Sequence, residues 1–472
     1  MKKSRLFLSF FILIITGFLL ISACSSVNKS GSDQNALVMT VGSSINLLDK
    51  ITAFDAEGSN ITWKSNSANI ARVDENGIVT ASRAGQAVIT ASSGGKTQNF
   101  NINATIAGQV NIMDLPPMKD QFSEYFMIGA IMHNGSSQRQ GGFPSNVPPG
   151  AATVPAWISH HFNVITHENE LKPGSITNSR NSSTGVITYN FATADRMLDA
   201  ALASGLKVVG HTLLWHSQIP EWQRAMGDQP RDVALAAMRQ YVTDVVSRYA
   251  GKMYSWDVLN EIFPNSYAGG NWRAGMRSEN PWFRSIGADF VYEGFLAARR
   301  ADPNALLYYN DFNLNENGKA TAVRNMVRDI NEQYIREHGG TRPLIDGIGM
   351  QGHYNVDVSA SSVRRSLDLF RPLGVKISIS ELDVLSQTWS EYSSGAAPST
   401  GGRLNSASLY GDYFKVFLEN ADIIERVTFW GVFDEQSWRG RGLPLPFEGY
   451  PDIKAKPAYY RIIAALEQFQ QR

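Results

Sequence analysis

The chain has 472 residues, and its 43 Lys and Arg balance 43 Asp and Glu, so the formal net charge is zero at neutral pH. Balanced charge excludes a strong electrostatic attraction to nucleic acid or another polyanion, and it fits a neutral ligand. The length exceeds what one hydrophobic core usually organises, so we expect at least two folded units.

Residues 1–23 have the pattern of a lipoprotein signal peptide. Three basic residues within the first five precede an apolar run over 6–21, which is short for a membrane-spanning helix and ends in small residues. Residues 20–24 (LISAC) resemble the bacterial lipobox, whose cysteine carries lipid after cleavage. Cys24 is the only cysteine, so no disulfide can form within the chain. We expect an exported bacterial lipoprotein, anchored to a membrane through Cys24 and facing the periplasm or cell surface; the alternative is an ordinary signal peptide with an incidental cysteine.

Residues 24–36 are mostly small and polar, which predicts a flexible tether. From 37 to 106, short apolar–polar alternations broken by Gly and Asn are typical of a small all-β sandwich, with a tight turn at 74–77. Trp63, the run 70–73, Asn76-Gly77 and Gly85 resemble the bacterial Ig-like group 2 domain. The resemblance implies that Trp63 is a core residue and that the domain is a spacer; a binding module is the alternative.

Residues 107–118 form a Gly- and Pro-containing linker, and from 119 to 472 short apolar runs alternate with longer helical patterns. Helices are expected over 194–204, 231–249, 283–301 and 319–338. Eight runs are expected as strands: 126–131, 162–166, 207–211, 255–260, 305–309, 345–351, 376–380 and 426–430. This βα alternation predicts an α/β fold, a (β/α)8 TIM barrel, with a long surface loop over 135–154.

Active sites of TIM barrels lie at the C-terminal ends of the strands, and polar or aromatic residues follow seven of these runs, including Asp434 after the eighth. Glu261 after the fourth run and Glu381 after the seventh supply the two carboxyl groups that glycosidic bond hydrolysis requires. His353 and Asp383 would keep Glu381 ionised. Either glutamate alone has a structural ion pair as its alternative, but the joint pattern favours catalysis.

Residues 211–218 (HTLLWHSQ), 256–261 (WDVLNE) and 379–384 (ISELDV) resemble the xylanases of glycoside hydrolase family 10, over a region that runs from 118 to the C-terminus. The resemblance implies a retaining endo-β-1,4-xylanase that cuts xylan and xylo-oligosaccharides without a cofactor. It implies Glu261 as acid/base, Glu381 as nucleophile and Asn260 as the residue that holds the substrate 2-hydroxyl. His353 would contact Glu381, and Asp383 would orient His353.

The same resemblance implies a set of substrate-binding residues: Glu168, Asn169, Lys172, His211, Trp215, Gln218, Gln351, Phe312, Trp430 and Trp438. Phe312 stands where the family usually has tyrosine, which puts one hydrogen bond on the aglycone side in doubt. The loops 135–154 and 266–279 are longer than expected and would reshape subsites. Trp256 and Trp282 are expected in the core. The remaining histidines lack ligand spacing, so we expect no metal: His133, His160, His161, His167 and His338.

Two other functions remain open at this point. A related retaining β-glycanase, a cellobiosidase or mixed-linkage glucanase, would keep the fold and the chemistry and change the sugar. A surface adhesin that binds polysaccharide without cutting it would fit the lipid anchor and the Ig-like domain, but retention of both glutamates argues against it. We expect the catalytic domain to be monomeric and the chain to bind no nucleic acid.

Overall fold

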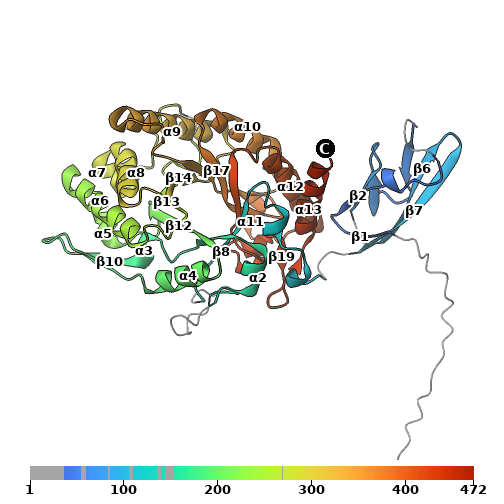
Figure 1. Ribbon diagram of the computed structural model, residues 1–472, viewed down its shortest axis with the longest axis horizontal. Helices are drawn as coiled ribbons and strands as arrows, with labels where there is room; N and C mark the ends of the chain where they lie inside the picture. The colour runs from blue at the N-terminus through green and yellow to red at the C-terminus, as the bar shows by residue number, and fades with distance from the viewer. Residues whose placement is uncertain are drawn as a thin grey trace, which may run out of the picture.

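The computed structural model describes residues 37–54, 60–82, 85–105, 110–135, 140–143, 153–267 and 269–472. The predicted signal peptide, the predicted lipidation site Cys24 and the predicted tether lie outside these residues, as does most of the predicted loop 135–154. Over the described ranges, every helix is too short or too polar to span a bilayer. Figure 1 shows a small N-terminal β domain beside a larger barrel of strands and helices.

The N-terminal domain is a sandwich of two sheets around its own hydrophobic core. One sheet has the order β1 (Leu37–Thr40), β7 (Lys96–Thr105), β6 (Gly85–Ser93) and β3 (Thr62–Ser65). The other has the order β2 (Ser44–Asn46), β5 (Ile78–Ala81) and β4 (Ala71–Val73). The core includes Met39, Leu47, Val79, Ile89 and Ile102. The predicted all-β sandwich is therefore confirmed.

Trp63 packs against this core, as the Ig-like resemblance implied. Its ring lies 6.3 Å from that of Phe100. The turn at 74–77 forms as predicted, since the Asp74 carboxylate accepts hydrogen bonds from the backbone N–H groups of Asn76 and Ile78. Gly77 has φ 77°, and a Cβ there would lie 2.5 Å from the Trp63 ring, so only glycine fits.

Eight parallel strands close into the barrel, and all eight predicted runs form strands. They are β8 (Met127–Met132), β9 (Val164–His167), β12 (Lys207–Leu214), β13 (Ser255–Asn260), β14 (Leu306–Asp311), β15 (Gly347–Met350), β17 (Lys376–Val384) and β18 (Ile424–Phe429). The ring closes because β18 pairs in parallel with β8. Strands β12 and β17 run further than predicted. The two-residue strand β16 (His353–Tyr354) pairs alongside β17.

Helices surround the barrel. They are α1 (Met118–Gln121), α2 (Ala156–His161), α3 (Pro173–Ile176), α4 (Ala192–Ala203), α5 (Glu221–Met226), α6 (Arg231–Arg248), α7 (Pro281–Ile286), α8 (Asp289–Ala301), α9 (Asn317–His338), α10 (Ala360–Phe370), α11 (Trp389–Ser394), α12 (Thr400–Leu418) and α13 (Pro457–Gln470). Two hairpins, β10 (Thr177–Arg180) with β11 (Ile187–Tyr189) and β19 (Phe447–Glu448) with β20 (Lys454–Ala455), complete the domain. The predicted single helix over 283–301 is wrong: Gly287, at φ 76°, ends α7 before α8 begins.

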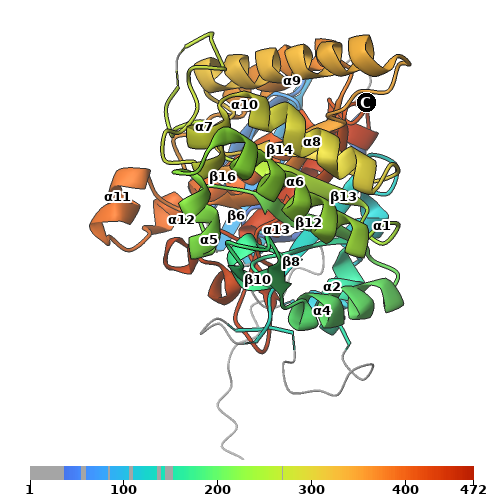
Figure 2. The ribbon, with the colours of Figure 1, turned by 90° about the vertical axis from the view of Figure 1, so that its left-hand side faces the viewer.

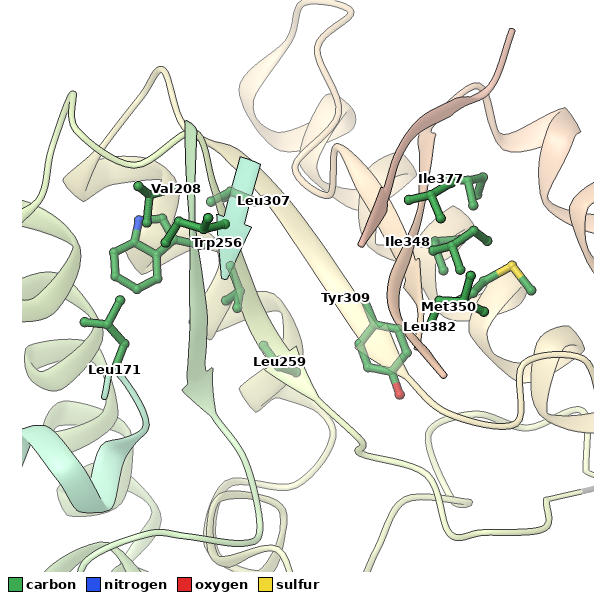
Figure 3. Packing of buried hydrophobic residues seen from close by; sticks show 14 of the residues in the cluster. Leu171, Val208, Trp256, Leu259, Leu307, Tyr309, Ile348, Met350, Ile377 and Leu382 are labelled. Carbon is green, nitrogen blue, oxygen red and sulfur yellow. The ribbon is translucent and has the colours of Figure 1, made fainter. Parts of the chain in front are cut away.

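Side chains of neighbouring strands and helices pack closely around the barrel (Figure 3). Trp256 on β13 and Trp282 on α7 are fully buried, which confirms their predicted packing role. Gly210 on β12 makes room for the Trp256 ring, because a Cβ at position 210 would lie 2.1 Å from that ring. This close packing fixes the positions of the strands relative to one another, and with them the positions of the side chains at the strand ends.

The sandwich contacts the barrel domain at α13. Ser44 accepts a hydrogen bond from Arg461 Nη1 at 3.3 Å. Gly42 lies against Pro457, where a Cβ would come within 2.9 Å of the proline. Figure 1 places α13 at the edge of the barrel domain that faces the sandwich.

Candidate active site

A cleft opens at the C-terminal ends of the barrel strands. Fourteen of the fifteen predicted site residues line it, and the fifteenth, Asp383, lies buried behind His353. Because these residues come from seven different strand ends and their loops, the closed barrel is what brings them together.

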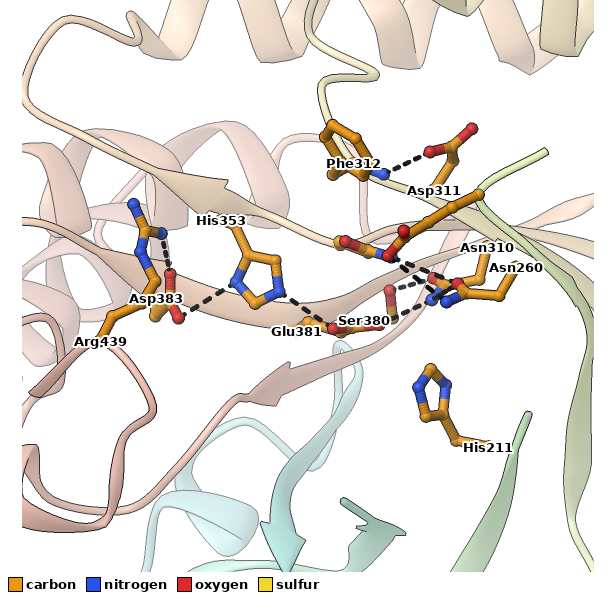
Figure 4. Close-up of polar contacts among 12 residues, drawn as sticks. His211, Asn260, Asn310, Asp311, Phe312, His353, Ser380, Glu381, Asp383 and Arg439 are labelled. Atoms are coloured by element: carbon orange, nitrogen blue, oxygen red, sulfur yellow. Dashed lines mark hydrogen bonds and ion pairs between the residues drawn. The ribbon is translucent and has the colours of Figure 1, made fainter. Parts of the chain in front are cut away.

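Glu381, at the end of β17, is held by two neighbours. His353 Nε2 lies 3.0 Å from Glu381 Oε2, and Asn310 Nδ2 donates to Glu381 Oε1 at 2.7 Å. Behind the imidazole, Asp383 Oδ2 lies 3.0 Å from His353 Nδ1, and Arg439 Nη1 lies 2.5 Å from Asp383 Oδ1. Figure 4 shows this line of alternating charge from Arg439 to Glu381.

The line of charges fixes the protonation states around Glu381. Burial alone would raise the pKa of Glu381, but the hydrogen bond from His353, the nearby charge of His211 and the Asn310 amide together lower it. Burial would lower the pKa of His353, whereas the charge of Asp383 and the bonds to both carboxylates raise it to about 9. Burial would likewise raise the pKa of Asp383, and Arg439 and His353 lower it. The site therefore holds an ionised Glu381 beside an imidazolium.

Glu261, at the end of β13, has neutral hydrogen-bond donors in place of charged ones. Trp215 Nε1 donates to Glu261 Oε2 at 3.0 Å, and Gln351 Nε2 donates to Glu261 Oε1 at 2.9 Å. Its backbone is left-handed, with φ 55°, and its N–H donates to the carbonyl of Asn310. This conformation is uncommon outside glycine and is a mark of functional sites.

Three amides join the two carboxylates. Asn310 Nδ2 donates both to Glu381 and to Asn260 Oδ1, the latter at 3.0 Å. Gln351 Nε2 donates both to Glu261 and to Asn260 Oδ1, the latter at 3.2 Å. The NH₂ groups of Asn310 and Gln351 each donate to two acceptors, so the orientation of these two amides is determined, and Asn260 is oriented through its Oδ1. The two carboxylates are thus held in one fixed frame, of which Figure 4 shows Asn260, Asn310 and Glu381.

A second polar group lies at the ends of β9 and β12. Lys172 Nζ donates to Asn169 Oδ1 at 3.0 Å and to Gln218 Oε1 at 2.8 Å, and Gln218 Nε2 donates to Asn169 at 3.1 Å. The ammonium lies 5.0 Å from the centre of the Trp215 ring. Burial lowers the pKa of Lys172, against the opposing effect of the surrounding carboxylates. These donors can recognise hydroxyl groups from one side of a ligand.

Two indoles and an imidazole form the opposite part of the cleft. The Trp430 ring lies 5.3 Å from His211 and 6.2 Å from His353, and Trp438 lies 5.3 Å from His353. His211 Nδ1 lies 2.9 Å from Asp257 Oδ2, which leaves Nε2 for the cleft. Flat indole faces stack on the apolar faces of sugar rings while polar groups bind the hydroxyls.

Phe312 lines the cleft after β14, and a buried ion pair supports it. Lys319 Nζ lies 3.7 Å from the centre of the Phe312 ring and 2.7 Å from Asp311 Oδ1, with both charged groups fully buried. Asp311 also accepts the Tyr309 hydroxyl at 2.5 Å. Burial raises the pKa of Asp311 to about 6 despite the Lys319 charge.

The loop after Glu261, predicted to reshape subsites, braces the acid/base region. Arg277 Nε donates to the carbonyl of Glu261 at 3.0 Å, and its Nη2 donates to Asn265 Oδ1 at 2.9 Å. Asp434, expected among the strand-end residues, does not line the cleft; it is buried and pairs with Lys456 at 2.7 Å. Among the described residues, His, Cys, Asp and Glu side chains nowhere gather in a group of three or more suited to a metal ion.

Sequence reasoning missed several residues of the site. Asn310 directly follows the fifth predicted run and was among the polar strand-end residues, but it was assigned no role; it lies within β14. Asp257 lies within β13, and Arg439 lies in the loop after β18; only the closed barrel shows their partners. Asn313, also among the polar residues after the fifth run, lines the cleft, and other cleft residues that were not predicted are Asn265, Asn315, Glu316, Asn355, Val358 and Trp389.

A closed (β/α)8 barrel whose strand ends present two carboxyl groups, amide donors and indoles defines a glycoside hydrolase. The chain belongs to glycosyl hydrolase family 10, whose sequence model matches residues 118–465. The model of the bacterial Ig-like domain (group 2) matches residues 31–105.

Individual relatives agree with this assignment. Endo-1,4-beta-xylanase A of Thermotoga neapolitana is 34% identical over 74% of this chain, and the chain spans 31% of its length. Endo-1,4-beta-xylanase B of Paenibacillus barcinonensis is 30% identical over 74% of this chain and 98% of that protein. The crystal structure of a bacterial Ig-like domain containing GH10 xylanase from termite gut is 45% identical, with a TM-score of 0.76 over 93% of this chain and 99% of that one.

Proposed function

We propose that the chain is a retaining endo-β-1,4-xylanase that cuts internal bonds of xylan. The observation that carries this proposal is the contrast between two glutamates in one frame. Glu381 is held ionised by His353, whereas Glu261 is bound by an indole and an amide that add no positive charge. Retaining hydrolysis needs one carboxylate nucleophile and one carboxyl group that gives and takes a proton. The names of the relatives above support xylan as the substrate.

The first half of the reaction forms a bond to Glu381. Its carboxylate attacks the anomeric carbon while Glu261 gives its proton to the leaving glycosidic oxygen, so the bond to the aglycone breaks and a glycosyl-enzyme ester forms. Asn310 and His353 fix the attacking carboxylate. Trp215 and Gln351 fix the proton donor. Such positioning lowers the barrier because little reorganisation is needed.

The second half reverses the roles of acid and base. Glu261 takes a proton from water, the water oxygen attacks the anomeric carbon, and Glu381 leaves as carboxylate. Two displacements at one carbon restore the β-configuration. The imidazolium of His353 stabilises the charge that returns to Glu381, which is the form its surroundings favour.

The remaining site residues bind the sugar. Asn260 Oδ1 already accepts from two amides, and its NH₂ group makes only a 3.4 Å contact with Glu261, so it is available to donate to the substrate 2-hydroxyl. Glu168, Asn169, Lys172, His211 and Gln218 bind hydroxyls on the glycone side. Trp430 and Trp438 stack on the rings.

The product of the reaction tests this proposal. We expect the protein to release xylo-oligosaccharides from xylan, with the β-anomer appearing first in the NMR spectrum. We expect it to hydrolyse an aryl xylobioside faster than the matching aryl cellobioside. If the α-anomer forms first, the double displacement is wrong. If the aryl cellobioside reacts faster, the substrate is a glucan and not xylan. If the protein binds xylan without turnover, it is an adhesin.

We also propose that the protein is exported and anchored through lipid on Cys24, as the pattern of residues 1–24 indicates. A single lipid-bearing N-terminus, a tether and a sandwich would hold a monomeric catalytic domain away from the membrane. Mass spectrometry of the mature N-terminus tests the anchor: we expect diacylglycerol on Cys24, and an unmodified N-terminus beyond Cys24 contradicts it.

A further inference from the structure

The short helix α11 follows the nucleophile strand β17 at the edge of the cleft. Thr388 and Glu391 form a capping box at its start, with the Thr388 side chain bound to the Glu391 N–H and the Glu391 carboxylate bound to the Thr388 N–H. Gly395 ends the helix in the left-handed conformation. Figure 2 shows α11 standing out from the body of the barrel. The local sequence therefore defines this helix at both ends, although it projects from the domain.

The first residue of α11, Trp389, presents its indole to the cleft. It lines the same cleft as Glu261 and Glu381, and 55% of its surface is exposed. Among the ten tryptophans, only Trp389 and Trp438 are exposed, and both line the cleft. Single exposed apolar residues scattered over a surface are common and need no explanation. Two exposed indoles that line the same cleft are different, and they indicate a binding surface.

Contacts behind Trp389 hold it in place. Its ring lies 5.7 Å from that of Tyr392. The Arg439 guanidinium lies 5.8 Å from the rings of both Trp389 and Trp438, and it is itself fixed by Asp383. One buried cation therefore supports both exposed indoles and the charged line that leads to Glu381. Since Asp383 already pairs with the guanidinium, this cation offers little charge to an anionic ligand, and a neutral ligand fits better.

We propose that Trp389 is a further sugar-binding platform, which stacks on a xylosyl unit of a long chain beyond the units next to the scissile bond. This inference rests on the proposed xylanase function and extends its substrate-binding surface to the β17–α12 segment. The exposed face of an indole suits the apolar face of a neutral pyranose ring, and Asn355, which also lines the cleft, can donate to a hydroxyl. Trp438, the other exposed indole that lines the described cleft, already has a stacking role in the proposed function, so Trp389 would add a further platform.

Substrate length gives the test. We expect Trp389→Ala to lower the ratio of kcat/KM for xylohexaose to kcat/KM for an aryl xylobioside by about tenfold, since only the longer chain reaches the platform. Trp389→Phe keeps a flat face and should recover part of that ratio. The bond-cleavage pattern of xylohexaose should also shift, because the register that places a sugar on Trp389 loses its advantage.

Ser390→Ala is the matched control, because Ser390 is exposed on the same helix and is not among the cleft residues. An equal loss for both substrate lengths, or the same loss in Ser390→Ala, overturns the platform. Calorimetric binding of xylohexaose to Glu381→Gln, with and without Trp389→Ala, gives a readout that needs no turnover. If wild-type protein releases no sugar, the proposed xylanase function fails, whereas equal xylohexaose affinity in those two variants overturns the platform alone.

Discussion

The surroundings of Glu381 and Glu261 differ in charge. Glu381 faces an imidazole whose far side is paired with Asp383 and Arg439, so positive and negative groups alternate along a buried line. Glu261 faces the indole of Trp215 and the amide of Gln351, which donate hydrogen bonds and carry no charge. A charged donor favours the carboxylate strongly, whereas a neutral donor orients the carboxyl group and leaves proton exchange accessible.

This difference in charge assigns the nucleophile role to Glu381 and the acid/base role to Glu261, without reference to their positions along the chain. Both glutamates end parallel strands, and both touch the same amide frame through Asn310, Asn260 and Gln351. Shared geometry therefore cannot separate their roles, and the neighbours must. If the assignment is correct, removal of each glutamate gives a distinct chemical signature.

The largest effect is expected at Glu381. Glu381→Ala removes the nucleophile, and we expect kcat/KM on an aryl xylobioside to fall by about 10⁴-fold or more. Azide should restore part of the rate from the vacated side and give the α-glycosyl azide. Product analysis by NMR identifies the anomer. A β-azide, or a loss of less than tenfold, assigns Glu381 another role.

The effect at Glu261 should depend on the leaving group. Glu261→Ala removes the proton donor, so hydrolysis of xylan, whose leaving group is a sugar hydroxyl, should fall by about 10²–10⁴-fold. An aryl glycoside with an acidic phenol needs no proton, and its glycosylation step should lose much less. Rates measured over a series of phenols give the check: a flat dependence in the variant contradicts the acid role.

The charged line predicts a dependence of stability on pH. The folded-state pKa of His353, about 9, lies above its ordinary 6.5, so the imidazolium stabilises the fold fully below pH 6.5 and this contribution disappears as pH rises through 9. At most it amounts to about 3 kcal/mol. Asp383→Asn removes the largest influence that raises this pKa, so the loss of stability between pH 6.5 and 9 should shrink.

Urea unfolding at pH 6.5 and pH 9 measures this change. The variant also leaves Arg439 buried without its carboxylate, which lowers the free energy of unfolding at every pH, so only the difference between the two pH values is informative. Lys454, whose ion pair with Asp452 is largely exposed, offers a control in Lys454→Gln, which should keep the wild-type pH dependence. Equal pH dependence in Asp383→Asn and wild type contradicts the assigned imidazolium.

The barrel could be predicted from the sequence because its signals are local. Apolar runs of the right length gave all eight strands, and polar residues directly after them gave the catalytic pair. The helix over 283–301 was predicted wrongly because apolar periodicity continues across Gly287, and the left-handed conformation that ends α7 depends on that one residue.

The partners of the site residues are not local. Asn310 bridges Asn260 and Glu381 only because β14 lies beside β13 and the closed ring brings β17 within reach of the same side chain. Trp389 lies at the start of α11, a helix of six residues. A helix this short has no apolar periodicity from which its position at the cleft could be predicted. The family resemblance identified most contact residues, but it carried no information on Trp389 or on the ion pair that supports Phe312.

The smallest effect is expected at Phe312, which stands where the family usually has tyrosine. Phe312→Tyr adds a hydroxyl at the proposed aglycone side of the cleft. Because Lys319 occupies one face of the ring at 3.7 Å, the ring should keep its orientation, and the new hydroxyl can donate to a bound sugar. One neutral hydrogen bond is worth about 0.5–1.5 kcal/mol, so KM for xylohexaose should fall about two- to tenfold. With an aryl xylobioside, whose aglycone is a phenol, the change should be smaller. Equal changes for both substrates would indicate that the hydroxyl acts through the Asp311–Lys319 pair beneath the ring and not through an aglycone contact.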